Sequence, residues 1–134
     1  MDTYVSGTVA AAREATIHSC PALALSQYQR RFASIDWERC ERRARSVLRR
    51  VLEHAPGRGA FWNANLPHPA DEAIDCEIVE CRLDPSPSGV RFEPSAEGFT
   101  WNGDYHNRPR LPGMDIDTCF GGRVALTRLH LSVD

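Results

Sequence analysis

Apolar residues recur with a helical period in two stretches of the first half of the chain. Residues 8–18 predict a helix, which the segment Ser19-Cys20-Pro21 ends. Asp36 is the predicted N-cap of a longer helix over 36–54, in which apolar residues recur at three- and four-residue steps. Those apolar residues are Trp37, Cys40, Ala44, Val47, Leu48, Val51 and Leu52. The opposite, solvated face is predicted to carry Arg39, Arg42, Arg43, Arg45, Arg49 and Arg50.

Between these helices, residues 22–26 form a short apolar run that is typical of a buried strand in a parallel sheet. A parallel strand needs a parallel neighbour, and no stretch before residue 22 has a strand pattern. We therefore expect this strand either to expose an unpaired edge or to lie on a helix without its natural neighbours. Because unpaired edges recruit other chains, we also expect self-association or poor solubility.

The second half of the chain is dominated by strand patterns. Strands are predicted at 60–67, 76–83 and 122–131, a hairpin from 90–93 and 98–101, and an ordered loop at 103–110. The last strand alternates, with one side made of Val124, Leu126, Arg128 and His130 and the other of Ala125, Thr127, Leu129 and Leu131. The chain is thus predicted to be α/β, with residues 1–59 ending an α/β core and residues 60–134 forming a β-rich extension and closing strand.

Composition and charge narrow the class of protein. The 134 residues amount to one domain or part of one, and 42% hydrophobic with 25% charged residues is usual for a globular chain. A net charge of −2 argues against binding to a nucleic acid polymer or to an anionic membrane surface. Glu38, Glu41 and Glu53 interleave with the helix arginines, which favours ion pairs over a nucleic-acid surface. All 16 basic residues are arginine, so lysine-based catalysis is excluded.

Targeting signals and cysteine usage predict a cytoplasmic protein. Neither a membrane span nor a secretory signal is predicted from the apolar pattern. The five cysteines do not have the spacing of a zinc site; they are Cys20, Cys40, Cys76, Cys81 and Cys119. Reduced, mostly buried thiols are therefore expected.

The segment Ser6-Gly7-Thr8 predicts a tight turn that opens directly into a helix of small residues. The first N–H groups of a helix lack internal partners and carry the positive end of its dipole, so they attract phosphate. The hydroxyls of Ser6 and Thr8, together with the missing Cβ of Gly7, would let an anion approach those N–H groups closely. These three residues are the predicted phosphate-binding site. The alternative is an ordinary Ser or Thr N-cap that binds nothing.

Other candidate chemistry is weaker. Asp115 and Asp117 are predicted to share one face of a strand, where paired carboxylates can bind a metal or act as acid and base, although most such pairs are surface features. Asp104 and His106 have the same spacing in the predicted loop, where a lone histidine is usually exposed. No supporting context makes Cys119 and His106 a nucleophile pair, and the sequence contains no G-x-S-x-G, H-E-x-x-H or Walker motif.

Four segments follow one another in an order that is found in a known family. Residues 2–15, DTYVSGTVAAAREA, are similar to D-x-x-Y-S-G-T-V-A-A-A-x-E-G. Residues 21–26, 63–67 and 115–129 are similar to P-x-I-A-x-S, N-V-N-x-P and D-x-D-x-x-x-x-x-G-x-I-S-V-T-P-L. In this order the segments resemble the SurE survival-protein family of 5′/3′-nucleotidases. Val5 departs from this pattern, because the family usually has Tyr before the Ser.

The resemblance implies an activity, a fold and an assembly. The activity is hydrolysis of nucleoside monophosphates to nucleoside and phosphate, and it depends on a divalent metal ion, Mg or Mn. The fold is a three-layer α/β sandwich with a Rossmann-like core. A C-terminal β extension of that fold builds homodimers or tetramers.

The resemblance also implies that most of the metal site is missing from this chain. The family's metal ligands are an Asp-Asp pair, a Ser and an Asn, and none of those positions is expected here. Only Ser6, Gly7 and Thr8 carry over, as residues that face the phosphate, and no catalytic or metal-binding residue is assigned. We expect the C-terminal part of a SurE-like protein that is inactive by itself. A separate possibility is that Met1 is an internal methionine or a misassigned start. The alternative is a non-catalytic oligomerising or binding module derived from the same family.

Overall fold

Four strands form one mixed sheet in the computed structural model, which describes residues 2–30, 33–68, 77–87 and 91–131. β1 (Leu23–Gln27) and β2 (Ala60–Leu66) are parallel, and β6 (Val124–His130) pairs antiparallel with β2. β3 (Ile78–Glu80) lies parallel to β6, which gives the strand order β1-β2-β6-β3. Strands from both halves of the chain therefore share one sheet.

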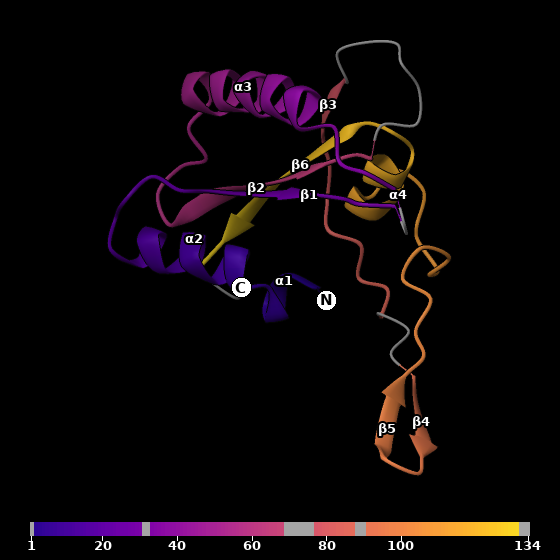
Figure 1. Ribbon diagram of the computed structural model, residues 1–134. Helices are drawn as coiled ribbons and strands as arrows, with labels where there is room; N and C mark the ends of the chain where they lie inside the picture. Colours follow the sequence, from indigo (N-terminus) through magenta and orange to yellow (C-terminus); the bar gives the residue numbers. More distant parts are fainter. Residues whose placement is uncertain (1, 31–32, 69–76, 88–90, 132–134) are drawn as a thin grey trace.

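Helices cover both faces of this sheet (Figure 1). α2 (Gly7–Ile17) lies on one face and α3 (Trp37–Glu53) on the other. Two shorter helices are also present: α1 (Asp2–Val5) precedes α2, and α4 (Asp115–Phe120) precedes β6. The three-layer α/β arrangement confirms the predicted fold class. None of the helices in the described part of the chain combines the length and apolar character needed to cross a bilayer.

The two faces of the sheet bury separate apolar clusters, because alternate residues of a strand point to opposite sides. The cluster against α3 consists of Val47, Trp62, Ala64, Leu66, Val124 and Leu126. The cluster against α2 consists of Val9, Ala12, Ala24 and Phe61, with Leu129 and Leu131 packed against it. The alternation predicted for the closing strand is confirmed by this division.

Side-chain caps define where the two long helices begin. The carboxylate of Asp36 accepts a hydrogen bond from the backbone N–H of Arg39 at 3.0 Å, which confirms the predicted N-cap of α3. The hydroxyl of Ser6 accepts from the N–H of Val9 at 3.2 Å and caps α2 in the same way. α2 ends at Ile17, and Ser19 beyond it adopts a left-handed conformation with φ of 60°.

Some residues of α3 are buried or exposed contrary to the prediction. Trp37 and Leu52, predicted to be inward, are 72% and 82% exposed. Arg43, predicted to be solvated, is buried. The fully buried stripe of the helix is narrow and comprises Cys40, Arg43 and Val47, while Ala44 and Val51 are partly buried beside it.

Other boundaries also shift. Asp115 and Asp117 were expected on one face of a strand, but they lie in the first turn of α4. The strand predicted at 76–83 is reduced to β3, and the last strand to Val124–His130. Cys76 lies outside the described residues.

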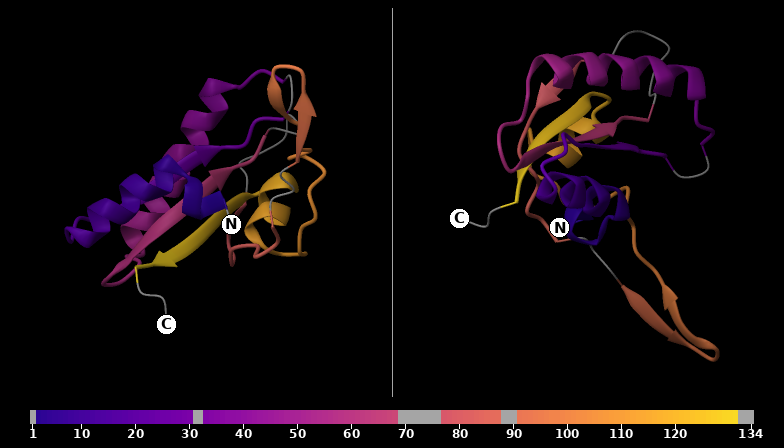
Figure 2. Two further views of the ribbon diagram at one scale, coloured as in Figure 1. Left: turned by 90° about the horizontal axis from the view of Figure 1, so that it is seen from below. Right: turned by 90° about the vertical axis from the view of Figure 1, so that its left-hand side faces the viewer.

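The predicted hairpin is present, with β4 (Phe92–Ser95) antiparallel to β5 (Gly98–Trp101). It extends away from the sheet and from α2 (Figures 1 and 2). Among the described strands β1 lies at one edge of the sheet, and its parallel neighbour β2 follows it in the chain rather than preceding it.

Candidate functional site

A cavity of about 300 Å³ lies where the parallel strands β1 and β2 end, beside the first turn of α2. Its walls come from α1, α2, the ends of β1 and β2, the loop that contains Tyr105, and α4. Open α/β sheets bind their ligands at the carboxyl ends of their strands. The cavity is therefore the candidate functional site of the described chain.

The Ser6 turn forms the anion-attracting side of this cavity. Ser6 lines the cavity and is half-buried, whereas Gly7 and Thr8 are exposed at the start of α2 and do not line it. A Cβ added at Gly7 would meet no protein atom within 4 Å, so the space beside this residue is open. The structure therefore brings one of the three predicted phosphate-binding residues to the cavity wall, and the other two follow it in the chain outside the lining.

Two amide side chains form the wall next to this turn. Asn63 and Asn65 lie on the same side of β2 because they are two residues apart in a strand, and both line the cavity. Asn63 is only 2% exposed. Each amide can both donate and accept hydrogen bonds. Sequence reasoning used these residues only as part of a family segment, although two polar residues at a spacing of two in a buried strand are themselves a signal of a site.

Carboxylates gather on the other side of the cavity, where Asp2, Asp84 and Asp115 line it. Asp84 is buried; its carboxylate accepts from the N–H groups of Ser86 and Leu111 at 2.8 and 2.7 Å. Burial acts to raise the pKa of Asp84, but these hydrogen bonds and the nearby Arg108 outweigh it and lower that pKa.

Asp115 has the opposite electrostatic setting. Burial raises its pKa, and the negative charge of Asp84 adds to the rise. Its carboxylate accepts from the backbone N–H of Asp84 at 2.6 Å. Asp117 points elsewhere: it accepts from the N–H of Gly113 at 2.9 Å and lies 3.7 Å from Arg110. The structure thus separates the two aspartates that sequence spacing had paired.

No group of three or more His, Cys, Asp or Glu side chains in the described ranges is arranged to hold a metal ion. The carboxylates of the cavity are instead committed to backbone N–H groups and to arginine. The residues described do not by themselves fit the divalent metal centre that the family implies.

The remaining wall is aromatic, and we define the aromatic wall as Tyr28, Tyr105 and Phe120. The rings of Tyr28 and Phe120 are stacked, with centroids 4.2 Å apart and planes 16° apart. The hydroxyl of Tyr28 is 2.8 Å from Nδ1 of His106. His106, expected to be exposed, is half-buried and hydrogen-bonded. The thiol of Cys119 lies 3.7 Å from the carbonyl oxygen of Leu66.

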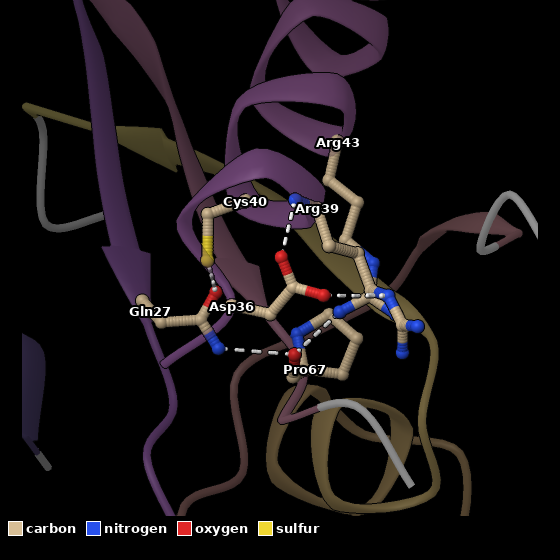
Figure 3. Close-up of polar contacts among 6 residues, drawn as sticks. All are labelled: Gln27, Asp36, Arg39, Cys40, Arg43 and Pro67. Atoms are coloured by element: carbon tan, nitrogen blue, oxygen red, sulfur yellow. Dashed lines mark hydrogen bonds and ion pairs between the residues drawn. The ribbon is translucent and has the colours of Figure 1, made fainter. Parts of the chain in front are cut away.

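A polar network beneath the cavity fixes the ends of β1 and β2 against α3 (Figure 3). The carbonyl oxygen of Pro67 accepts from Nη1 of Arg43 at 2.8 Å and from Nε2 of Gln27 at 3.0 Å. Oε1 of Gln27 is 3.0 Å from the thiol of Cys40. Gln27 also lines the cavity, so the buried Arg43 helps to position the end of β1.

Comparisons with known proteins all point to one family. A family model described as survival protein SurE matches residues 1–84. A protein of Nostoc sp. whose name reads "Putative 5′-nucleotidase" is 37% identical over 131 residues, which cover 98% of this chain and 58% of that protein. The 5′-nucleotidase SurE of Paramagnetospirillum magneticum is 32% identical, over 96% of this chain and 51% of its own length.

A solved structure shows the same fold. The crystal structure of the SurE protein from Aquifex aeolicus matches with a TM-score of 0.74 and 23% identity, over 99% of this chain and 54% of that one. The chain therefore spans about half the length of the relatives that it matches.

Proposed function

Because the chain belongs to the SurE survival-protein family, we propose that it carries the phosphate-binding part of a nucleotidase site and seats a nucleoside monophosphate at Ser6-Gly7-Thr8. One observation carries this proposal: Ser6 opens α2 beside the cavity at the carboxyl ends of β1 and β2. The related proteins named 5′-nucleotidase supply the substrate class.

The turn suits an anion for physical reasons. The first N–H groups of α2 concentrate partial positive charge, and fixed N–H donors stabilise negative charge that develops on phosphoryl oxygens during transfer. The open space beside Gly7 admits an oxygen close to the backbone. Asn63 and Asn65 offer amide donors from β2 to the same bound group.

Titration calorimetry with inorganic phosphate and with AMP tests the proposal on two variants, each of which lacks the N-cap side chain of one helix. Ser6→Ala and Asp36→Ala each remove the N-cap of one helix, and each should cost roughly 1 kcal/mol of stability. We expect Ser6→Ala to lower the affinity for both phosphate and AMP by about tenfold or more, because a hydrogen bond to a charged group is lost. Asp36→Ala should leave binding unchanged, since Asp36 is not part of the cavity wall.

Two results would contradict this proposal. One is equal loss of ligand affinity in both variants, which would show an effect of stability alone. The other is an unmodified protein that binds neither phosphate nor AMP. That result would favour the rival function, a non-catalytic module in which Ser6 is only a helix cap.

We further propose that most of the family's metal site is absent from this polypeptide and that it releases little phosphate from AMP on its own. The carboxylates around the cavity have protein partners, and the described residues contain no metal-binding group of three. A phosphate-release assay with Mg or Mn should therefore stay near background. Steady turnover that EDTA abolishes would contradict this expectation.

The rival module function is favoured by the hairpin. β4 and β5 extend from the sheet and expose aromatic side chains, with Phe92 at 60%, Phe99 at 76% and Trp101 at 55% exposure. Exposed apolar patches mark association surfaces. We propose that the chain forms a homodimer or tetramer through this hairpin. We also propose a cytoplasmic location, in keeping with the thiols of Cys20, Cys40 and Cys81, which are not in disulfide bonds.

A further inference from the structure

The aromatic wall is an apolar part of the cavity that phosphate binding does not use. Phosphate needs donors and positive charge, which the Ser6 turn and the amides of Asn63 and Asn65 supply. Tyr28, Tyr105 and Phe120 add apolar ring surface to the same cavity. A ligand that fills the cavity must therefore have a flat, apolar part as well as an anionic part.

Tyr105 is placed as a ligand contact rather than as a core residue. It is 42% exposed, although it lines the cavity. Its ring meets Phe120 with centroids 5.9 Å apart and His106 with centroids 6.0 Å apart, in both cases edge to face. Large aromatic surface that faces a cavity and not the core is typical of a ligand pocket.

The loop that carries Tyr105 is held before any ligand arrives. The carboxylate of Asp104 accepts from the N–H groups of His106 and Asn107, each at 3.1 Å. His106 in turn bonds the hydroxyl of Tyr28, and the guanidinium of Arg108 lies 5.5 Å from the ring centre of Tyr105. Pre-organised rings lose little conformational entropy when a ligand stacks on them.

We infer that the aromatic wall is a nucleobase subsite, on which the base of a nucleoside monophosphate stacks while its phosphate occupies the Ser6 turn. This inference rests on the proposed function, since it assigns a second part of the same substrate. The cavity of about 300 Å³ is at the lower end of the range for ligand pockets, which fits one nucleotide rather than an oligonucleotide. Stacking on rings is tolerant of base identity, because every base has a π-face.

Calorimetric titration of the 134-residue protein with adenosine, AMP and inorganic phosphate tests the subsite. We expect Tyr105→Ala to lower the affinities for adenosine and AMP roughly 5- to 150-fold, the range found when a stacking ring is removed. The affinity for phosphate should be unchanged. Tyr105→Phe keeps the ring and should retain affinity within about twofold. Trp37→Ala removes an aromatic side chain that is 72% exposed on α3, outside the cavity wall, and should change no affinity.

The outcomes separate the subsite from the proposed function. The nucleobase subsite is overturned if AMP binds Tyr105→Ala as tightly as it binds the unmodified protein. It is also overturned if Tyr105→Phe loses as much AMP affinity as Tyr105→Ala. If phosphate binds and AMP binds no more tightly than phosphate, the subsite is overturned and the proposed function stays intact. Adenosine binding that depends on the Tyr105 ring, with no binding of phosphate, overturns the proposed function and supports the ring subsite. Binding of none of the three ligands overturns both.

Discussion

Replacing Arg108 with methionine should lower the free energy of unfolding by about 3 to 5 kcal/mol, the usual cost of removing one partner from a buried charged network. The side chain of Arg108 is 1% exposed. Its guanidinium forms an ion pair with Asp2 and donates to the carbonyl of Ser86 at 3.2 Å. Methionine preserves the apolar stem and much of the volume, so the charge and its hydrogen bonds are what the substitution removes.

Part of the cost of this substitution arises at Asp84, to which Arg108 adds a favourable charge beside the hydrogen bonds from Ser86 and Leu111. Asp84 is 2% exposed, and Arg108 contributes to the low pKa of its carboxyl group. Without the guanidinium, a buried carboxylate loses its nearby cation and cannot hydrate to compensate. Asp2 suffers less, because its side chain is 42% exposed and water can replace the lost partner.

Urea denaturation of Arg108→Met and Arg110→Met measures the effect against a matched control. Arg110 is 39% exposed, lies 3.7 Å from Asp117 and sits over the ring of Phe120. Its replacement should cost less than about 1 kcal/mol, as is usual for an exposed ion pair. Similar losses for the two variants would show that Arg108 acts through packing and not through charge.

Features that depend on neighbours in sequence could be predicted without the structure. The N-cap at Asp36 requires only the backbone three residues later, and the alternation of Val124 to His130 follows from the geometry of any half-buried strand. The fold class followed from the order of these local elements. The same reasoning located Ser6 as a helix cap, because a cap is a local signal.

Features that depend on distant residues could not be predicted. Arg43 carries a helix-surface pattern, yet it is buried because the carbonyl of Pro67, 24 residues later, accepts its hydrogen bond. The tyrosine–histidine contact of the aromatic wall joins residues 78 positions apart. Asp115 and Asp117 were misplaced for a different reason: α4 has only six residues and its N-cap Met114 makes no side-chain cap, so no local signal marked a helix. The cavity is built from such distant contacts, and for that reason the sequence located its Ser6 side but not its aromatic or acidic sides.

The pair Asp84 and Asp115 should show opposite dependences of stability on pH. The pKa of Asp84 is lowered in the folded protein, so its stabilising effect is complete above its ordinary value of 3.8 and is lost as the pH falls through the lowered pKa. The pKa of Asp115 is raised by burial, so its protonated form stabilises the fold below pH 3.8, and this contribution is lost as the pH rises through the raised pKa.

Asparagine at each position tests these signs. At pH 7, Asp84→Asn should destabilise the protein by about 2 to 4 kcal/mol, because each oxygen of Asp84 faces a backbone N–H and an amide NH₂ cannot accept from one of them. This deficit should shrink below pH 3.8. Asp115→Asn should stay within about 1 kcal/mol of the unmodified protein at pH 7, since its Oδ1 can still accept from the N–H of Asp84 and a buried negative charge is removed.

Urea denaturation between pH 3 and pH 7 distinguishes the two aspartates. The stability of Asp115→Asn relative to the unmodified protein should rise with pH, whereas that of Asp84→Asn should fall. Parallel trends in the two variants would contradict the assignment of one ionised and one proton-favouring carboxyl group to this side of the cavity. Opposite trends matter for the site as well, because a carboxyl group that favours its proton repels a bound phosphate less than a second carboxylate would.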